Sequence, residues 1–373
     1  MLRIHVLDRE GVRWFRGVPP FWYAVHLNRR YLREMRLRFG FFSAISDSLC
    51  DCDILFLSSR YFHLEGQSPS GKQKVLETLS ALNSKARKII WFDLRDSSGN
   101  TQFEVIPYVS KYLKKQLLRD RGKYREPFYG NRVYTDYFHK QFGIEDSYVE
   151  ESIPLPPGSE RKLGISWNIG LHDNRGGGLL RKLTYVLSDQ LEALGGTEHR
   201  IAWRSCSAKR EVHLVALFHQ HYERNTVAFQ RQRASQILAE LRETGVITGE
   251  KLPRTRYLQL VGNAKMVLSL FGWGEICFRD FEAFMAGAAL LRPDVSHLET
   301  WPDVYTAHET YWPVEWDLSD LVASYHHLLS HETLRLGLAQ TGQARYRRLW
   351  TREGRECFCE RLGEIVGSAL SEP

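Results

Sequence analysis

Residues 271–294 read FGWGEICFRDFEAFMAGAALLRPD, and this stretch predicts a loop, a helix and a strand in succession. Its first part, as far as Cys277, combines two glycines with aromatic residues and an acid, as expected of a loop that meets a ligand. The following apolar residues recur at helical spacing up to Gly287, where a glycine predicts a left-handed helix end. The run ALL then indicates a buried strand. Such a helix-to-strand return is typical of an α/β fold.

The rest of the chain repeats this alternation. In the first half, short apolar runs predict strands and helical spacing predicts helices: strands at 2–7, 35–43, 53–59 and 88–94, helices at 20–33 and 71–82. A basic segment, Tyr108–Arg125, reads as a further helix. In the second half the same patterns predict strands at 163–170, 212–218 and 265–271, and helices at 178–195, 228–245 and over most of 331–370.

The best linker is ESIPLPPGSERK, residues 151–162, which contains three prolines and a glycine. We therefore predict two Rossmann-like domains that face each other across a cleft, with parallel sheets covered by helices on both faces. The predicted first domain is 1–150 and the predicted second domain is 163–335. The helices of 336–373 are expected to pack back toward the first domain. Ligands of such folds lie beyond the carboxyl ends of the strands.

The composition supports a packed globular protein, with 43% hydrophobic and 25% charged residues among 373. The formal charge of +7 suggests polyanionic partners such as phosphates, nucleic acid or an acidic membrane surface, without choosing among them. We find neither a signal-peptide pattern nor a membrane-spanning run, so we expect a cytoplasmic protein that could lie against the inner face of a membrane.

Residues 267–303, VLSLFGWGEICFRDFEAFMAGAALLRPDVSHLETWPD, resemble the donor-binding signature of GT-B glycosyltransferases. The similarity is greatest to family 1/4-like or exostosin-like members, which share the pattern R-x-F-E-A…A-G, here Arg279 to Gly287. The resemblance implies that the first domain, 1–150, binds the acceptor and that the second domain, 163–335, binds a nucleotide-sugar donor. It also implies that Glu282 binds the ribose hydroxyls and that Glu275 is the catalytic acid facing the donor sugar. Better-known retaining families have seven residues between these glutamates, whereas this chain has six, so both retention and inversion stay open.

Physical arguments agree with these roles. A carboxylate accepts two hydrogen bonds from a cis-diol, and a helix N-terminus favours phosphate. Gly272 and Gly274 allow a close approach of the backbone to the sugar. A diphosphate leaving group needs positive charge, which arginine and lysine supply without a metal or another cofactor. The remaining predicted donor-binding residues are Trp273, Arg279, Arg231, Lys251, Tyr222, Asn174 and Gly176. The last two lie in NRGGGLL, which either cradles the diphosphate or is a plain flexible loop.

Asp93 and Asp96 end the strand predicted at 88–94. If the reaction inverts the anomeric centre, either residue could be the base that removes the acceptor proton. Alternatively, Asp96 caps a turn together with Ser97 and Ser98.

Basic residues concentrate in Asn28–Arg38 and Lys111–Arg125. Two basic N-terminal helices here could bind anionic lipid head groups near a lipid-linked acceptor, or they could be ordinary solvated faces. No nucleic-acid motif accompanies them, so nucleic acid is not expected as a partner. The predicted function is sugar transfer from a nucleotide-sugar to a hydroxyl of a glycan or lipid-linked acceptor, in bacterial surface polysaccharide synthesis. The alternatives are a non-catalytic GT-B-like scaffold and a sugar-nucleotide epimerase.

Overall fold

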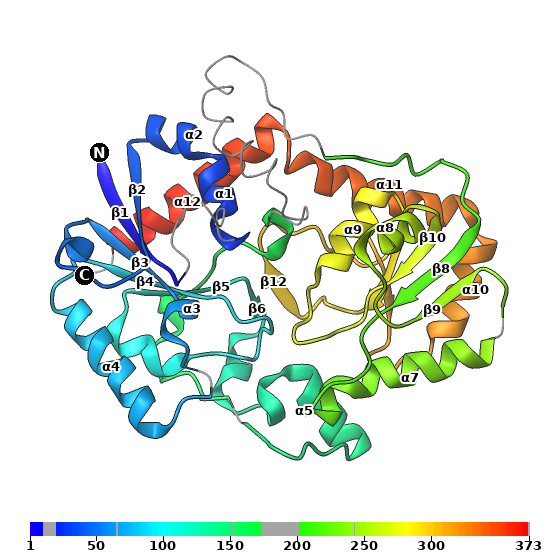
Figure 1. Cartoon of the computed structure of the whole chain (residues 1–373), viewed down its shortest axis with the longest axis horizontal. Coiled ribbons are helices and arrows are strands. Elements are labelled where there is room, and N and C mark those ends of the chain that lie inside the picture. Colours follow the sequence, from blue (N-terminus) through cyan, green and yellow to red (C-terminus); the bar gives the residue numbers. More distant parts are fainter. Residues whose placement is uncertain (10–19, 65, 151, 173–200, 242, 372–373) are drawn as a thin grey trace.

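The computed structural model describes residues 1–9, 20–64, 66–150, 152–172, 201–241 and 243–371. Its first sheet has six parallel strands in the order β2-β1-β3-β4-β5-β7 (Figure 1). Their bounds are β1 Leu2–Leu7, β2 Leu37–Phe42, β3 Ile54–Ser58, β4 Ile89–Asp93, β5 Lys111–Lys114 and β7 Leu163–Ile165. The helices of this half are α1 Tyr23–Leu27, α2 Arg29–Glu34, α3 Ser59–Phe62, α4 Pro69–Asn83 and α5 Val133–Phe142.

The first sheet is buried on both faces because its strands are apolar at successive positions. In β3, Ile54 and Phe56 enter one buried cluster, whereas Leu55 and Leu57 enter the other. Successive side chains of a strand point to opposite faces, so α4 packs in the cluster of Leu55 and Leu57, and α1 packs in the cluster of Ile54 and Phe56. Continuous apolar runs are what a covered parallel sheet requires, so the strand predictions in this half are confirmed.

The second sheet has five parallel strands in the order β13-β11-β10-β8-β9. Their bounds are β8 Val212–Leu217, β9 Val246–Gly249, β10 Ala264–Leu268, β11 Ala289–Pro293 and β13 Trp312–Val314. The helices of this half are α7 Asn225–Leu241, α8 Arg254–Gly262, α9 Phe278–Ala286, α10 Leu321–Ser330, α11 Glu332–Arg348 and α12 Arg352–Ser371. Gly287 ends α9 with φ 65°, which confirms the predicted left-handed helix end.

The sequence analysis predicted that the second domain begins at residue 163, after the linker 151–162, but two features place the boundary later. β7, at Leu163–Ile165, pairs with β5 of the first sheet, so this strand does not open the second domain. Among the described residues, the first strand of the second sheet is β8, which begins at Val212. The helix predicted at 178–195 lies outside the described residues. The last helix, α12 (red in Figure 1), packs on the first domain, where Phe358 and Leu362 share a buried cluster with Ile4 of β1.

The domains are also joined away from the linker. β6 (Gln116–Leu118) of the first half and β12 (Leu298–Thr300) of the second form a separate antiparallel pair. In addition, Phe138 of α5 packs against Phe229 of α7, with 5.1 Å between ring centroids and the rings tilted by 54°. The two Rossmann-like domains therefore form one continuous body.

The prediction of a helix at Tyr108–Arg125 is wrong. This segment forms β5 and β6, and Lys114 and Lys115 on it are buried. Lys114 Nζ donates to Asp93 Oδ2 at 3.1 Å and to the Asn100 carbonyl at 2.7 Å, so a neighbouring strand neutralises the buried charge. The proposed second basic helix face therefore does not exist. None of the described helices is both long and apolar enough to cross a bilayer.

Candidate active site

Three loops meet at the carboxyl edge of the second sheet. They follow β8, β9 and β10 and lead into α7, α8 and α9, whose N-terminal ends therefore point to this edge. Tyr222 lies in the first of these loops, Lys251 in the second, and Gly272 to Glu275 in the third. Lys251 is exposed, and Asn174 and Gly176 lie outside the described residues.

Two arginines converge beside the third loop. Arg231 donates Nε to the Phe271 carbonyl at 2.6 Å and a terminal nitrogen to the His219 carbonyl at 3.0 Å. Its guanidinium lies 5.1 Å from the centre of the Tyr222 ring. Burial lowers the pKa of Arg231, and the nearby positive charge of Arg279 lowers it further. The sequence analysis named both residues, and the structure brings them together.

This pair of arginines has no carboxylate partner within hydrogen-bonding reach in the described part of the chain. The Nε atom of Arg279 is buried there without any acceptor. Burial opposes the positive charge of Arg279, but nearby groups raise its pKa, among them the carboxylates of Asp280 and Glu282, which do not bond to it directly. Buried donors are normally satisfied, and two neighbouring cations repel each other. The arrangement therefore favours binding of an anion at this edge.

Gly272 and Gly274 both make close contacts within the protein, and their predicted contact with a sugar stays a prediction. A side chain at Gly272 would place its Cβ 2.6 Å from a terminal nitrogen of Arg231. At Gly274 the Cβ would lie 2.0 Å from the Asp96 carbonyl oxygen of the first domain. Between them, Trp273 is 42% exposed and lies edge-on to Tyr222 at 5.4 Å.

Glu282, the predicted ribose ligand, does not lie at the first turn of α9. It lies on the second turn, is 5% exposed, and accepts a hydrogen bond from Arg254 of α8 at 2.9 Å. The acid in the first turn is Asp280, which forms a capping box with Cys277 and pairs with the buried Arg292. The sequence analysis missed this role, although an acid three residues after the helix N-cap is a known capping signal.

Glu275 also differs from its predicted orientation. Its carboxylate is 1% exposed and points to the first domain, where it accepts hydrogen bonds from Ser97 and Ser98. This orientation argues against the predicted contact with the donor sugar, because first-domain donors occupy the carboxylate. Two further first-domain residues reach the same loop: Arg132 donates to the Trp273 carbonyl at 3.1 Å and Tyr134 to the Gly272 carbonyl.

The two candidate bases have opposite environments. Asp93 is fully buried; burial opposes its ionisation, but Lys114 and Arg95 outweigh this effect and hold its pKa at about 2. Asp93 is therefore an internal counter-ion, and its prediction as a base is wrong. The side chain of Asp96 is 59% exposed and accepts a hydrogen bond from Lys115 at 2.8 Å, which lowers its pKa. Asp96 stays a predicted base at the edge where the domains meet.

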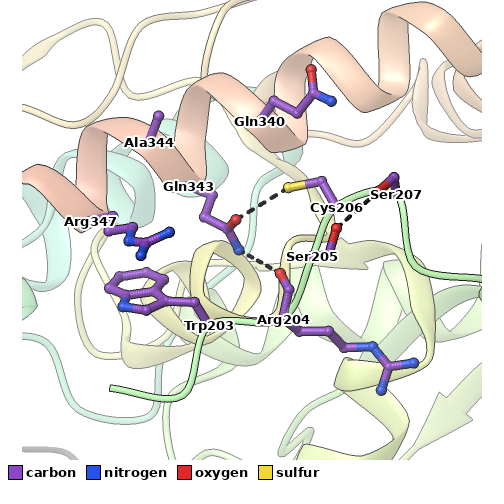
Figure 2. A pocket seen from close by; sticks show the side chains of 9 residues that line it. All are labelled: Trp203, Arg204, Ser205, Cys206, Ser207, Gln340, Gln343, Ala344 and Arg347. Carbon is purple, nitrogen blue, oxygen red and sulfur yellow. Dashed lines mark hydrogen bonds between the residues drawn. The ribbon is translucent and has the colours of Figure 1, made fainter. Parts of the chain in front are cut away.

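A hollow of about 440 Å³ lies elsewhere, between residues 203–207 and α11 (Figure 2). Gln343 of α11 donates there to the carbonyls of Arg204, at 2.8 Å, and of Phe284, at 2.9 Å. Phe284 is near the C-terminal end of α9, whereas the arginine pair is near the N-terminal end. This hollow is therefore separate from the candidate site. Among the described residues, no group of three histidine, cysteine or acidic side chains could hold a metal ion.

Two Rossmann-like domains that meet through the carboxyl ends of their strands define the GT-B architecture, which confirms the predicted fold class. Residues 213–356 match the family model described as "Glycosyl transferase-like". This part of the chain is therefore similar to glycosyl transferase-like domains, which confirms the resemblance seen in R-x-F-E-A…A-G.

Several solved structures are similar over nearly the whole chain. They include a DNA-modifying beta-glucosyltransferase (10% identity, 99% of each chain, TM-score 0.47) and Anabaena Alr3699/HepE in complex with UDP-glucose (10%, 99% of this chain and 100% of that one, 0.44). A third is an alpha-glucosyltransferase with UDP-glucose and DNA (9%, 98% and 99%, 0.43). The fold assignment rests on the two sheets themselves. No curated protein matches the chain.

Proposed function

We propose that this protein is a glycosyltransferase that transfers a sugar from a nucleotide-sugar to a hydroxyl group. The observation that carries the proposal is the pair Arg231 and Arg279, which lacks a carboxylate partner among the described residues and lies within the part of the chain that matches the glycosyl transferase-like family. Two guanidinium groups match the charge of a diphosphate, and they stabilise it as the sugar bond breaks. On this proposal no metal is needed, so turnover in excess EDTA should equal turnover in added Mg²⁺.

The first test is binding of nucleoside diphosphates by calorimetry, with UDP, GDP, ADP, dTDP and the monophosphate CMP compared. We expect one of them to bind, and Arg279→Gln to weaken it about 10- to 100-fold. Arg38→Gln, at an exposed position on β2 of the first domain, is the matched control and should bind as the wild type does. A protein that binds none of these nucleotides, or Arg279→Gln with unchanged affinity, contradicts the proposal.

We further propose that Glu282 accepts hydrogen bonds from the ribose hydroxyls, as the family resemblance implies. Its support is its place on α9 facing α8, where Arg254 orients the carboxylate. The wild type should then prefer the nucleotide that binds over its 2′,3′-dideoxy analogue by about tenfold. Glu282→Gln should lose most of that preference, and a variant that keeps it would remove Glu282 from the ribose site.

For the acceptor we propose a glycan or lipid-linked hydroxyl, in bacterial surface polysaccharide synthesis. The support is the family resemblance and, on the membrane side, the basic segment 28–38 with the exposed Arg119, Lys123 and Arg125. Lys114 and Lys115 are buried and do not contribute. The acceptor screen should include DNA as well, because the charge of +7 also suits that polyanion. Interconversion of sugars without an acceptor would instead identify an epimerase, and no turnover of any donor would identify a scaffold.

A further inference from the structure

Glu275 links two loops that carry different parts of the proposed reaction. Its own loop, Gly272–Glu275, belongs to the second domain and adjoins the arginine pair. Its carboxylate accepts hydrogen bonds from Ser97 Oγ at 2.9 Å, Ser98 Oγ at 2.7 Å and the Ser98 backbone N–H at 3.0 Å. All three donors belong to the loop after β4 of the first domain. The carboxylate is shielded from water, so these hydrogen bonds have little competition.

The same two loops also touch through their backbones. Gly274 approaches the Asp96 carbonyl so closely that no larger residue fits, and Gln116 donates to this same carbonyl. Asp96 directly precedes Ser97. Whatever holds Ser97 and Ser98 therefore also sets the position of the exposed Asp96 carboxylate relative to the second domain.

We propose that Glu275 is a positioning residue that fixes the Asp96 loop of the acceptor domain against the donor loop. This inference rests on the proposed function. It replaces a direct contact between Glu275 and the sugar by an indirect role, in which the acceptor base and the donor are held at a set separation. Precise placement matters, since a displacement of about 1 Å can cost about 100-fold in rate.

A double-mutant cycle separates the two roles. Glu275→Gln keeps the shape but removes one acceptor oxygen, and Ser97→Ala/Ser98→Ala removes the hydroxyl donors. We expect each to lower kcat about 10- to 100-fold, while nucleotide affinity stays within about threefold of the wild type. Combined, they should be no worse than the more severe change alone, because both break one interaction. Effects on kcat that multiply would overturn the inference.

A second variant tests the spacing while the carboxylate stays intact. Gly274→Ala introduces a Cβ where the Asp96 carbonyl lies, and should therefore reproduce the loss of kcat with nucleotide binding retained. Gly337→Ala on α11, which meets nothing within 4 Å, is the matched control and should leave kcat unchanged. Wild-type kcat in Gly274→Ala would contradict the inference.

The last measurement does not depend on turnover. Amide hydrogen exchange reports the Ser98 N–H, which donates to Glu275. In Glu275→Gln this amide should exchange about tenfold faster than in the wild type. Unchanged exchange would overturn the inference in any case. If the wild type binds no nucleotide, the proposed function fails, yet the exchange result still decides whether Glu275 fixes the loop.

Discussion

Asp93, one of the two predicted bases, is a buried counter-ion in the core of the first domain. Its carboxylate is fully buried and accepts hydrogen bonds from Lys114, from the Arg95 backbone and from the Tyr112 hydroxyl. Burial lowers the pKa of Lys114 to about 8 even though the Asp93 carboxylate raises it. In Asp93→Asn the lysine either stays charged without a partner or gives up its proton, and we expect a loss of about 3–5 kcal/mol in the free energy of unfolding. Chemical denaturation measures this change. Lys114→Met in the same variant should restore part of the loss, and a fully stable Asp93→Asn would contradict the ion-pair role.

The same residue predicts a dependence on pH. The folded pKa of Asp93 is about 2, below the usual value of 3.8, so its contribution is complete above about pH 4. That contribution is lost as the pH falls from about 4 to about 2. The stability difference between the wild type and Asp93→Asn should therefore shrink across this interval. A difference that stays constant between pH 5 and pH 2 would argue against the lowered pKa.

The end of α9 depends on a single glycine. Gly287 has φ 65°, and a Cβ there would lie 2.7 Å from the Arg204 carbonyl. Gly287→Ala should thus lower the free energy of unfolding by more than about 1 kcal/mol, through both the strained backbone and the clash. Gly337→Ala in α11, where space is open, should raise it by about 0.5–1 kcal/mol. Equal effects of the two changes would show that the backbone conformation is not what matters.

The domains are tied together at several separate places. The β6–β12 pair, the contact between α5 and α7, and the bonds of Glu275 all cross between them. A hinge motion would have to break each of these, so we expect nucleotide binding to leave the overall shape unchanged. Small-angle X-ray scattering with and without saturating nucleotide checks this expectation. A clear decrease in the radius of gyration on binding would instead indicate closure.

Local patterns were enough to predict most of the fold. Apolar runs such as residues 54–58 predicted strands, and Gly287 predicted a helix end, because both signals lie within a few residues. The segment around Lys114 was predicted as a helix, since nothing nearby shows that this lysine pairs with Asp93, 21 residues away. Glu275 was misread for the same reason: Ser98 is 177 residues distant, and sequence alone does not reveal which domain a buried carboxylate faces.

The packing of α12 has a consequence for synthesis on the ribosome. The first domain is translated first, but the cover of its apolar face around Ile4 and Phe56 is completed only when the 20 residues of α12 have emerged. Meanwhile the second sheet, complete by Val314, can already assemble. The first domain is therefore made first but completed last. During most of translation the nascent chain exposes hydrophobic surface that α12 later covers, and such exposed surface is what chaperones bind.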